Sequence, residues 1–287
     1  MTATATTSAS SRTASFDPRR ALLYLIAIVV LLVIVVPLTF SVFGGFRSNA
    51  QLASDPVGLP DPWIWANYQS ALTDANFYRQ VGTSVVIALV TTLLVLPAAS
   101  LAAFVLARYR FRGREAIYIL FTLGLLFPIA VAILPLFITL RQTGLLNNPL
   151  GVAMPQAAFG LPLSIVILRP FFRSIPKDLE DAAVIDGCGA FRFYWSVMLP
   201  LSRPVLSTIA VLTVVGSWNA FLLPLLVLVR ADQWTLPLGI NNISTTFVTD
   251  TAAILAYTTL AMIPALVFYF IAQRQIVSGL TAGGVKG

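Results

Sequence analysis

The stretch QVGTSVVIALVTTLLVLPAASLAAFVLA, residues 80–107, contains no Asp, Glu, Lys or Arg and is long enough to cross a membrane as a helix. About 20 apolar residues suffice, because an α-helix rises about 1.5 Å per residue and the hydrocarbon core is about 30 Å thick. Five other uncharged stretches are of similar character, namely residues 21–46, 116–140, 150–168, 204–229 and 252–273. None shows the alternation of a membrane barrel. The sequence therefore predicts an all-α, polytopic membrane protein with six transmembrane helices.

The composition excludes several kinds of site. Hydrophobic residues make up 58% of the chain and charged residues only 10%, whereas about a quarter of residues are charged in soluble domains. There is no His and one Cys, Cys188, which excludes imidazole metal sites, His-based acid–base catalysis and internal disulfides. We therefore expect no catalytic residue and no metal site. We also expect no binding of nucleic acid, because the basic residues flank the apolar stretches.

The basic residues also predict which side of the membrane each loop faces. With six spans, fourteen of the 18 Lys and Arg residues fall on the side that holds both termini, and four fall on the other side. The positive-inside rule places the richer side in the cytoplasm. Both termini and the loop 169–203, between the fourth and fifth spans, are therefore predicted to be cytoplasmic.

The chain divides into a short N-terminal arm and one membrane domain, residues 19–287. Residues 1–18 are rich in Ser, Thr and Ala and lack an apolar period, which predicts a disordered cytoplasmic arm. A cleaved signal peptide and an organelle transit peptide are the alternatives. The apolar run after Arg20 is longer than the core of a signal peptide and has no A-x-A-like end, which favours an uncleaved first span.

The loop 169–203 begins with an acidic segment that predicts a helix. Four of the 11 acidic residues of the chain lie within nine positions: Asp178, Glu180, Asp181 and Asp186. Pro176 and the acids after it suit the first turn of a helix, and Gly187 suits the left-handed residue that ends one. Small side chains would form a narrow face for a close partner, made of Leu179, Ala182 and Ala183.

A second helix is predicted after Gly187. It would turn one apolar face toward the membrane spans, formed by Phe191, Tyr194, Trp195 and Met198, and would stop at Leu199-Pro200. The combination of two helices and a glycine turn indicates an element that docks on another protein. A plain solvated loop is the alternative, since acids beside basic residues are common on surfaces.

The spacing of these residues resembles the EAA loop of the permeases of ABC importers. That pattern is Glu-Ala-Ala, three residues, Gly, nine residues, an aliphatic residue, one residue and Leu-Pro. Every spacing is kept by Asp181-Ala182-Ala183, Gly187, Val197 and Leu199-Pro200, although Asp181 replaces the usual Glu and follows Glu180. The resemblance implies that the ATPase-coupling residues are Glu180, Asp181, Ala182, Ala183, Asp186, Gly187, Leu199 and Pro200.

Other segments resemble the carbohydrate branch of this family, and within it the smaller permease subunit of maltose-type importers. They are Asn67-Tyr68, residues 107–113, Trp218-Asn219, Leu222-Leu223-Pro224 and residues 279–287. The resemblance implies a permease subunit of a binding-protein-dependent importer that moves a sugar or oligosaccharide across the bacterial cytoplasmic membrane. It also implies a second permease subunit, two cytoplasmic ATPase subunits that bind ATP and Mg²⁺, and an extracytoplasmic solute-binding protein as partners.

The energy for transport is expected to come from another subunit. The chain has no G-x-x-x-x-G-K-[ST] phosphate loop, so we expect it neither to hydrolyse ATP nor to hold a cofactor. The alternative function is that of an ion-gradient-driven secondary transporter. Such coupling generally needs ionisable groups within the spans, and these spans contain none, although backbone carbonyls could still bind sodium.

Three residues within the predicted spans are candidates for the transport pathway: Trp218, Asn219 and Tyr257. An indole offers a flat face to a sugar ring, and an amide inside an apolar span needs a hydrogen-bond partner. The alternative role for each residue is contact between packed helices.

Overall fold

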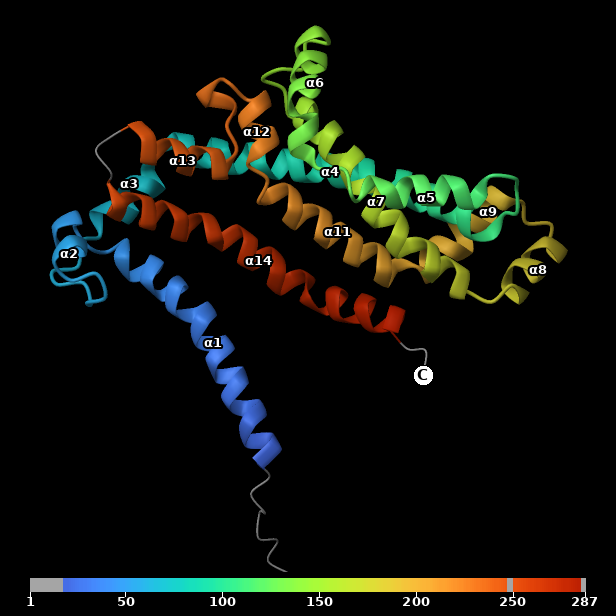
Figure 1. The fold of residues 1–287 in the computed structure, drawn as a ribbon, viewed down its shortest axis with the longest axis horizontal. Helices are drawn as coiled ribbons and strands as arrows, with labels where there is room; N and C mark the ends of the chain where they lie inside the picture. The colour runs from blue at the N-terminus through green and yellow to red at the C-terminus, as the bar shows by residue number, and fades with distance from the viewer. Residues whose placement is uncertain (1–17, 247–249, 285–287) are drawn as a thin grey trace, which may run out of the picture.

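The computed structural model describes residues 18–246 and 250–284, and the regular elements of this part are all helices (Figure 1). Within these described residues, four helices are long and apolar enough to cross a membrane: α1 (Pro18–Gly44), α4 (Ala75–Arg108), α7 (Pro149–Ser174) and α14 (Thr251–Gly284). Two bent helix pairs raise the candidate spans in the described residues to as many as six. The predicted all-α, polytopic membrane fold is confirmed. Apart from Pro18, the predicted arm 1–18 lies outside the described residues.

The third predicted span, residues 116–140, is not one straight helix. It is divided into α5 (Arg114–Gly124) and α6 (Ile129–Gln142), which are bent by 95° at the break between them. Proline explains the break, because it lacks an N–H group and disfavours helical angles in the residue before it. Pro128 has extended backbone angles and directly precedes α6. The third predicted span is therefore a bent pair of helices, which passes the length and composition test for a membrane span only when α5 and α6 are taken together.

The fifth predicted span, residues 204–229, is divided as well. α11 (Arg203–Trp218) ends before Asn219, and a separate helix, α12 (Leu222–Val227), follows. A continuous helix would set the ring of Pro224 against the carbonyl group of Ala220 four residues earlier. Because α12 starts only at Leu222, Pro224 falls in its first turn, where a missing N–H group breaks no intrahelical bond.

Short helices gather at the two ends of the long ones (Figure 1). One end holds α2 (Asn49–Ser54), α3 (Ala66–Thr73) and α13 (Leu236–Thr246), with a 3-10 turn at Ala231–Gln233. The other end holds α8 (Asp178–Ile185) and α9 (Ala190–Phe193), followed by a π-helical turn (Tyr194–Met198) and α10 (Leu199–Leu201). The segment Ala190–Leu201 meets α11 at an angle of 77°.

The core is built from α4, α7 and α11. The contact between α4 and α7 is the most extensive between any two helices in the described part of the chain. Small side chains on α4, Ala99, Ser100 and Ala103, are fully buried there, which lets the two backbones approach closely. Lipid is as apolar as these side chains, so packing rather than the hydrophobic effect holds the helices together.

α1 stands apart from this core. Its apolar side chains from Leu22 to Val36 are exposed, and Figure 1 shows the helix diverging from the bundle toward its N-terminal end. Near its other end, Ser41 Oγ lies 3.2 Å from Thr259 Oγ1 and the Tyr68 hydroxyl donates to the Val42 carbonyl at 2.8 Å. The exposed length of α1 must therefore be covered by lipid or by another membrane protein.

Candidate functional site

An arginine at the end of α4 fixes the position of α8. The Arg108 side chain is only 3% exposed, and its Nε donates to Glu180 Oε2 at 2.8 Å. Its Nη1 donates to the carbonyl groups of Ile175, at 2.7 Å, and Phe172, at 3.4 Å, which lie at the C-terminal end of α7. A cation is favourable at that end of a helix dipole. Arg108 therefore ties α4, α7 and α8 together.

The two neighbouring acids of α8 face different surroundings. Glu180 is half-buried against Arg108, whereas Asp181 is exposed. The pKa of Tyr109 is raised by burial and then by the charge of Glu180, so its phenol stays neutral beside this ion pair. Of these two acids, Asp181 is therefore the one that is accessible to a partner protein.

The exposed face of α8 differs from the predicted one. Ala183 is partly buried and packs against the core, so it is less exposed than Leu179 and Ala182. Ala182 and Leu179 are exposed, together with Val184 and, at 86% exposure, Ile185. We name the exposed side chains Leu179, Asp181, Ala182, Val184 and Ile185 the α8 outer surface.

Gly187 reverses the chain as predicted. Its φ of 72° lies in the left-handed region, which favours glycine. The Gly187 N–H donates to the Val184 carbonyl at 3.0 Å, and the Cys188 N–H donates to the Ala183 carbonyl at 2.8 Å. These bonds satisfy carbonyl groups at the end of α8. Asp186 is exposed directly before this turn.

The second helix of the loop was predicted less well. Tyr194 and Met198 are buried as expected, but Phe191 and Trp195 are exposed, at 70% and 53%, and the prediction is wrong for them. The helical segment ends at Leu201, one residue after Leu199-Pro200.

A wider turn accounts for this difference. Pro200 cannot donate a hydrogen bond, and the Leu199 N–H bonds to the carbonyl group of Tyr194, five residues earlier, which makes the turn π-helical. The wider turn changes which side chains share a face. Phe193 is buried instead, and the buried Tyr194 hydroxyl lies 2.5 Å from Ser100 Oγ on α4.

The three pathway candidates do not share one cavity. Trp218 and Asn219 line a cavity of about 180 Å³ against α4 and α14, and Asn219 Nδ2 donates to the Val215 carbonyl of its own helix at 2.9 Å. Tyr257 lines a different cavity, and its hydroxyl donates to Gln80 Oε1 at 3.1 Å. The Tyr257 ring also packs edge-on against Phe77, so its contacts here are with other helices.

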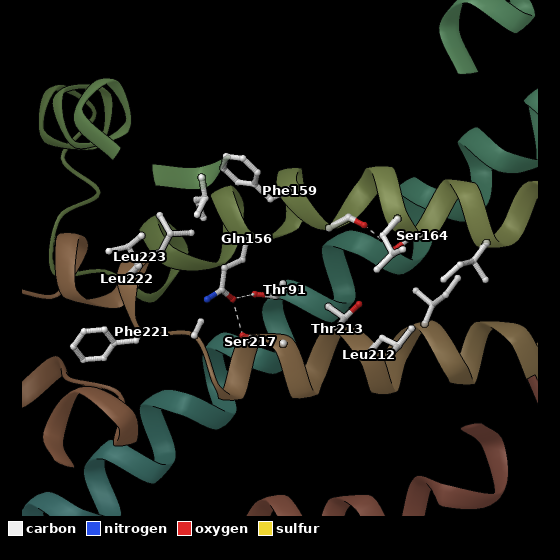
Figure 2. A pocket seen from close by; sticks show the side chains of 17 residues that line it. Thr91, Gln156, Phe159, Ser164, Leu212, Thr213, Ser217, Phe221, Leu222 and Leu223 are labelled. Carbon is white, nitrogen blue, oxygen red and sulfur yellow. Dashed lines mark hydrogen bonds between the residues drawn. The ribbon is translucent and has the colours of Figure 1, made fainter. Parts of the chain in front are cut away.

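A larger cavity, of about 390 Å³, lies between α7 and α11 and has a polar centre (Figure 2). There Gln156 Oε1 accepts hydrogen bonds from Ser217 Oγ at 2.6 Å and from Thr91 Oγ1 at 3.1 Å, which joins α7, α11 and α4. The sequence interpretation missed Gln156. The available signal was its amide inside the fourth predicted span, the same argument that selected Asn219.

Comparison with known proteins identifies the family. Residues 96–281 match the family described as the binding-protein-dependent transport system inner membrane component. The chain belongs to this family. The matched part of the permease includes the loop 169–203 and the residues of the larger cavity apart from Thr91. The resemblance found in the EAA-like spacing is confirmed, and it favours an importer over an ion-gradient-driven transporter.

Related permeases align with nearly the whole chain. The permease is 36% identical to the diacetylchitobiose uptake system permease protein NgcG of Streptomyces coelicolor, over 95% of this chain and 92% of that protein. It is 34% identical to the arabinooligosaccharides transport system permease protein AraQ of Halalkalibacterium halodurans, over 88% of this chain and 91% of that protein.

The fold agrees with a solved structure. A chain in the crystal structure of a bacterial ABC transporter involved in the import of the acidic polysaccharide alginate superposes with a TM-score of 0.77. The two chains are 22% identical, and the match covers 93% of this permease and 99% of that chain. The protein is thus a membrane-embedded transport permease with the fold of an importer subunit.

A second set of ion pairs joins α5 to the C-terminal end of α7, beside the loop 169–203. Glu115, in the first turn of α5, accepts hydrogen bonds from Arg169 at 2.5 Å, Arg173 at 3.1 Å and Arg114 at 2.8 Å. The buried guanidinium of Arg169 also stacks on the Tyr118 ring, 3.9 Å from its centre.

Within the described residues, no group of three or more His, Cys, Asp and Glu side chains could hold a metal ion.

Proposed function

We propose that this permease imports a sugar or oligosaccharide across the bacterial cytoplasmic membrane, with α8, α9 and both termini on the cytoplasmic side. It works with a second permease subunit, an extracytoplasmic solute-binding protein and two ATPase subunits, on which ATP and Mg²⁺ bind. Support for the substrate class comes from the relatives named for diacetylchitobiose and arabinooligosaccharides. Support for the orientation comes from the excess of Lys and Arg on the side of the loop 169–203.

The α8 outer surface is the observation that carries the ATPase partnership. Large apolar side chains at 65% and 86% exposure, Val184 and Ile185, are unusual on a short helix in water and indicate a partner surface. Asp181 adds a charge that can select and orient that partner. Docking would therefore use Asp181, Ala182 and Asp186, whereas Glu180 and Ala183 hold α8 on the permease.

Two attachments would carry a movement of the loop into the core. Arg108 joins α8 to the end of α4, and the hydrogen bond between Tyr194 and Ser100 joins the π-helical turn to the same helix about two turns earlier. When the ATPase subunits close on ATP, a displaced α8 would pull on α4 and change which side of the membrane the pathway faces. This requires the docked loop to have different free energies in the two states. Gly187, Leu199 and Pro200 set the shape of the loop.

Uptake into vesicles tests the transport function. Proteoliposomes that hold the assembled complex and ATP in the lumen on the ATPase side should accumulate radiolabelled diacetylchitobiose when the solute-binding protein is added outside. An ion gradient without ATP should give no accumulation. Accumulation driven by the gradient alone would instead establish a secondary transporter.

A charge reversal tests the docking surface. Asp181→Lys should lower the amount of ATPase subunit that copurifies with the permease by at least about tenfold, because like charges facing each other across an interface cost several kcal/mol. Asp61→Lys, an exposed acid in the first extracytoplasmic loop, makes the same charge change and should leave copurification unaltered. Normal recovery of ATPase with Asp181→Lys would refute docking at this surface.

A further inference from the structure

The cavity between α7 and α11 combines apolar walls with one polar centre (Figure 2). Its walls include the aromatic rings of Phe159 and Phe221, and its polar centre is formed by Gln156, Thr91 and Ser217. The described residues that line it include no Asp, Glu, Lys or Arg. This composition is that of a ligand site, in which a few placed polar groups stand in a mainly apolar surface.

Of the two polar atoms of the Gln156 amide, only one has a hydrogen-bond partner among the described residues. Its Oε1 accepts both hydroxyl hydrogen bonds, but its Nε2 is buried and has no hydrogen-bond partner among the described residues. Figure 2 shows this nitrogen pointing away from the two hydroxyl groups. Turning the amide over would pair Nε2 and leave Oε1 without a partner. In either orientation one polar atom is unsatisfied, and such buried groups are rare enough to need an explanation.

The broken fifth span gives independent support for a site here. Phe221 and Leu222, at the break between α11 and α12, form part of the cavity wall, as does Ile129 beside the break between α5 and α6. Irregular backbone at membrane depth is tolerated where it is buried in protein or lines a cavity. Interrupted helices also form the substrate sites of many transporters.

We infer that this cavity binds one neutral sugar ring of the transported solute, with the Gln156 amide as the group that recognises a sugar hydroxyl. The inference rests on the proposed function and deepens it. A sugar ring has hydroxyl groups that donate and accept hydrogen bonds, and a C–H face that can lie on Phe159 or Phe221. The volume of about 390 Å³ is near the lower end for ligand pockets, about 300–1,000 Å³, which suits one ring rather than a chain. A carboxylated sugar would bury a charge with no counter-charge, so it should be rejected.

Binding without the solute-binding protein tests the inference directly. The purified complex of both permeases and the ATPase subunits should bind tritiated diacetylchitobiose and should bind a uronic-acid disaccharide much more weakly. Gln156→Met keeps the length of the side chain without adding a charge and removes the amide donor together with the interhelical bonds. It should weaken binding of the neutral sugar about fivefold or more, the factor expected for one lost hydrogen bond. Gln142→Leu, at the exposed end of α6, should bind as the unaltered complex does.

The outcomes separate a binding role from a packing role. Ser217→Ala removes one interhelical bond but leaves the Gln156 amide in place. A packing role would lower the melting temperature of the complex in both variants and leave sugar affinity unchanged with Gln156→Met, whereas a binding role would lower sugar affinity with Gln156→Met more than with Ser217→Ala. Unchanged sugar affinity with Gln156→Met would overturn the inference. Uptake by a complex that shows no binding to this cavity would also overturn it, while the proposed function stands. Absence of ATP-driven sugar uptake by the unaltered complex would overturn the proposed function and the inference with it.

Discussion

Replacing Arg108 by methionine should loosen α8 from the end of α4. Methionine keeps much of the apolar stem but removes the charge and all the donors to Glu180, Ile175 and Phe172. A hydrogen bond that involves a charged group contributes about 1.5–3 kcal/mol. Arg108 is 3% exposed, but Glu180 is 27% exposed and can regain water once its partner is lost. We therefore expect a loss of about 3 kcal/mol in the free energy that holds α8 in place, rather than the sum of all the bonds.

A change of about 3 kcal/mol raises the population of molecules with α8 detached by about 150-fold. Hydrogen–deuterium exchange in lipid nanodiscs measures this population, and amides of residues 178–186 should exchange about 150-fold faster in Arg108→Met. Arg112→Met makes the same substitution at an exposed site four residues along and should leave the exchange of α8 unchanged. Equal exchange in the two variants would show that Arg108 does not hold α8, and the proposed transmission to α4 would lose its main support.

Two other predictions concern packing and orientation. A Cβ added at Gly151 would overlap the backbone oxygen of Leu145, so Gly151→Ala should destabilise the permease by at least about 2 kcal/mol in thermal unfolding, whereas Gly82→Ala meets no atom within 4 Å and should be neutral or slightly stabilising. The topology can be tested by labelling in a variant in which Cys188 is replaced by serine. A cysteine introduced at the exposed position Ile185 should react with a membrane-impermeant maleimide only from the cytoplasmic side, and one introduced at the exposed position Val57 only from the outside. Labelling of both positions from the same side would refute the assigned topology.

The sequence predicted the long helices well because a membrane span is specified mainly by length and lack of charge. It did not predict the breaks in the third and fifth spans, because an apolar composition indicates that a segment lies in lipid but does not indicate where the helix axis changes direction. Pro128 and Pro224 carried that information, but α7 keeps Pro155 and Pro162 within one continuous helix. Whether a proline breaks a helix depends on neighbours that can donate a hydrogen bond to the carbonyl group four residues before it, which the proline leaves unpaired, and such neighbours can lie far away in sequence.

The candidate site shows the same limit at the level of single residues. Glu180 and Asp181 are adjacent acids, and the difference between them depends on Arg108, which lies 72 residues before Glu180. The π-helical turn changes which aromatic side chains of the loop are buried. A pattern of residues read with the regular period of an α-helix cannot predict this change. Gln156 was overlooked because one amide in an apolar span is usually a packing contact, and only the cavity beside it distinguishes the two roles.

The separation of α1 from the bundle determines how the isolated subunit must be handled. The apolar side chains from Leu22 to Val36 are all exposed in the structure, whereas Ser41 and Gly44, near the other end of α1, are buried against the bundle. A detergent micelle around the lone permease must therefore enclose two apolar bodies that diverge, rather than one cylinder. Small micelles are expected to bridge that gap poorly, so purification together with the neighbouring subunit, or in a wide lipid disc, should give the better-behaved particle.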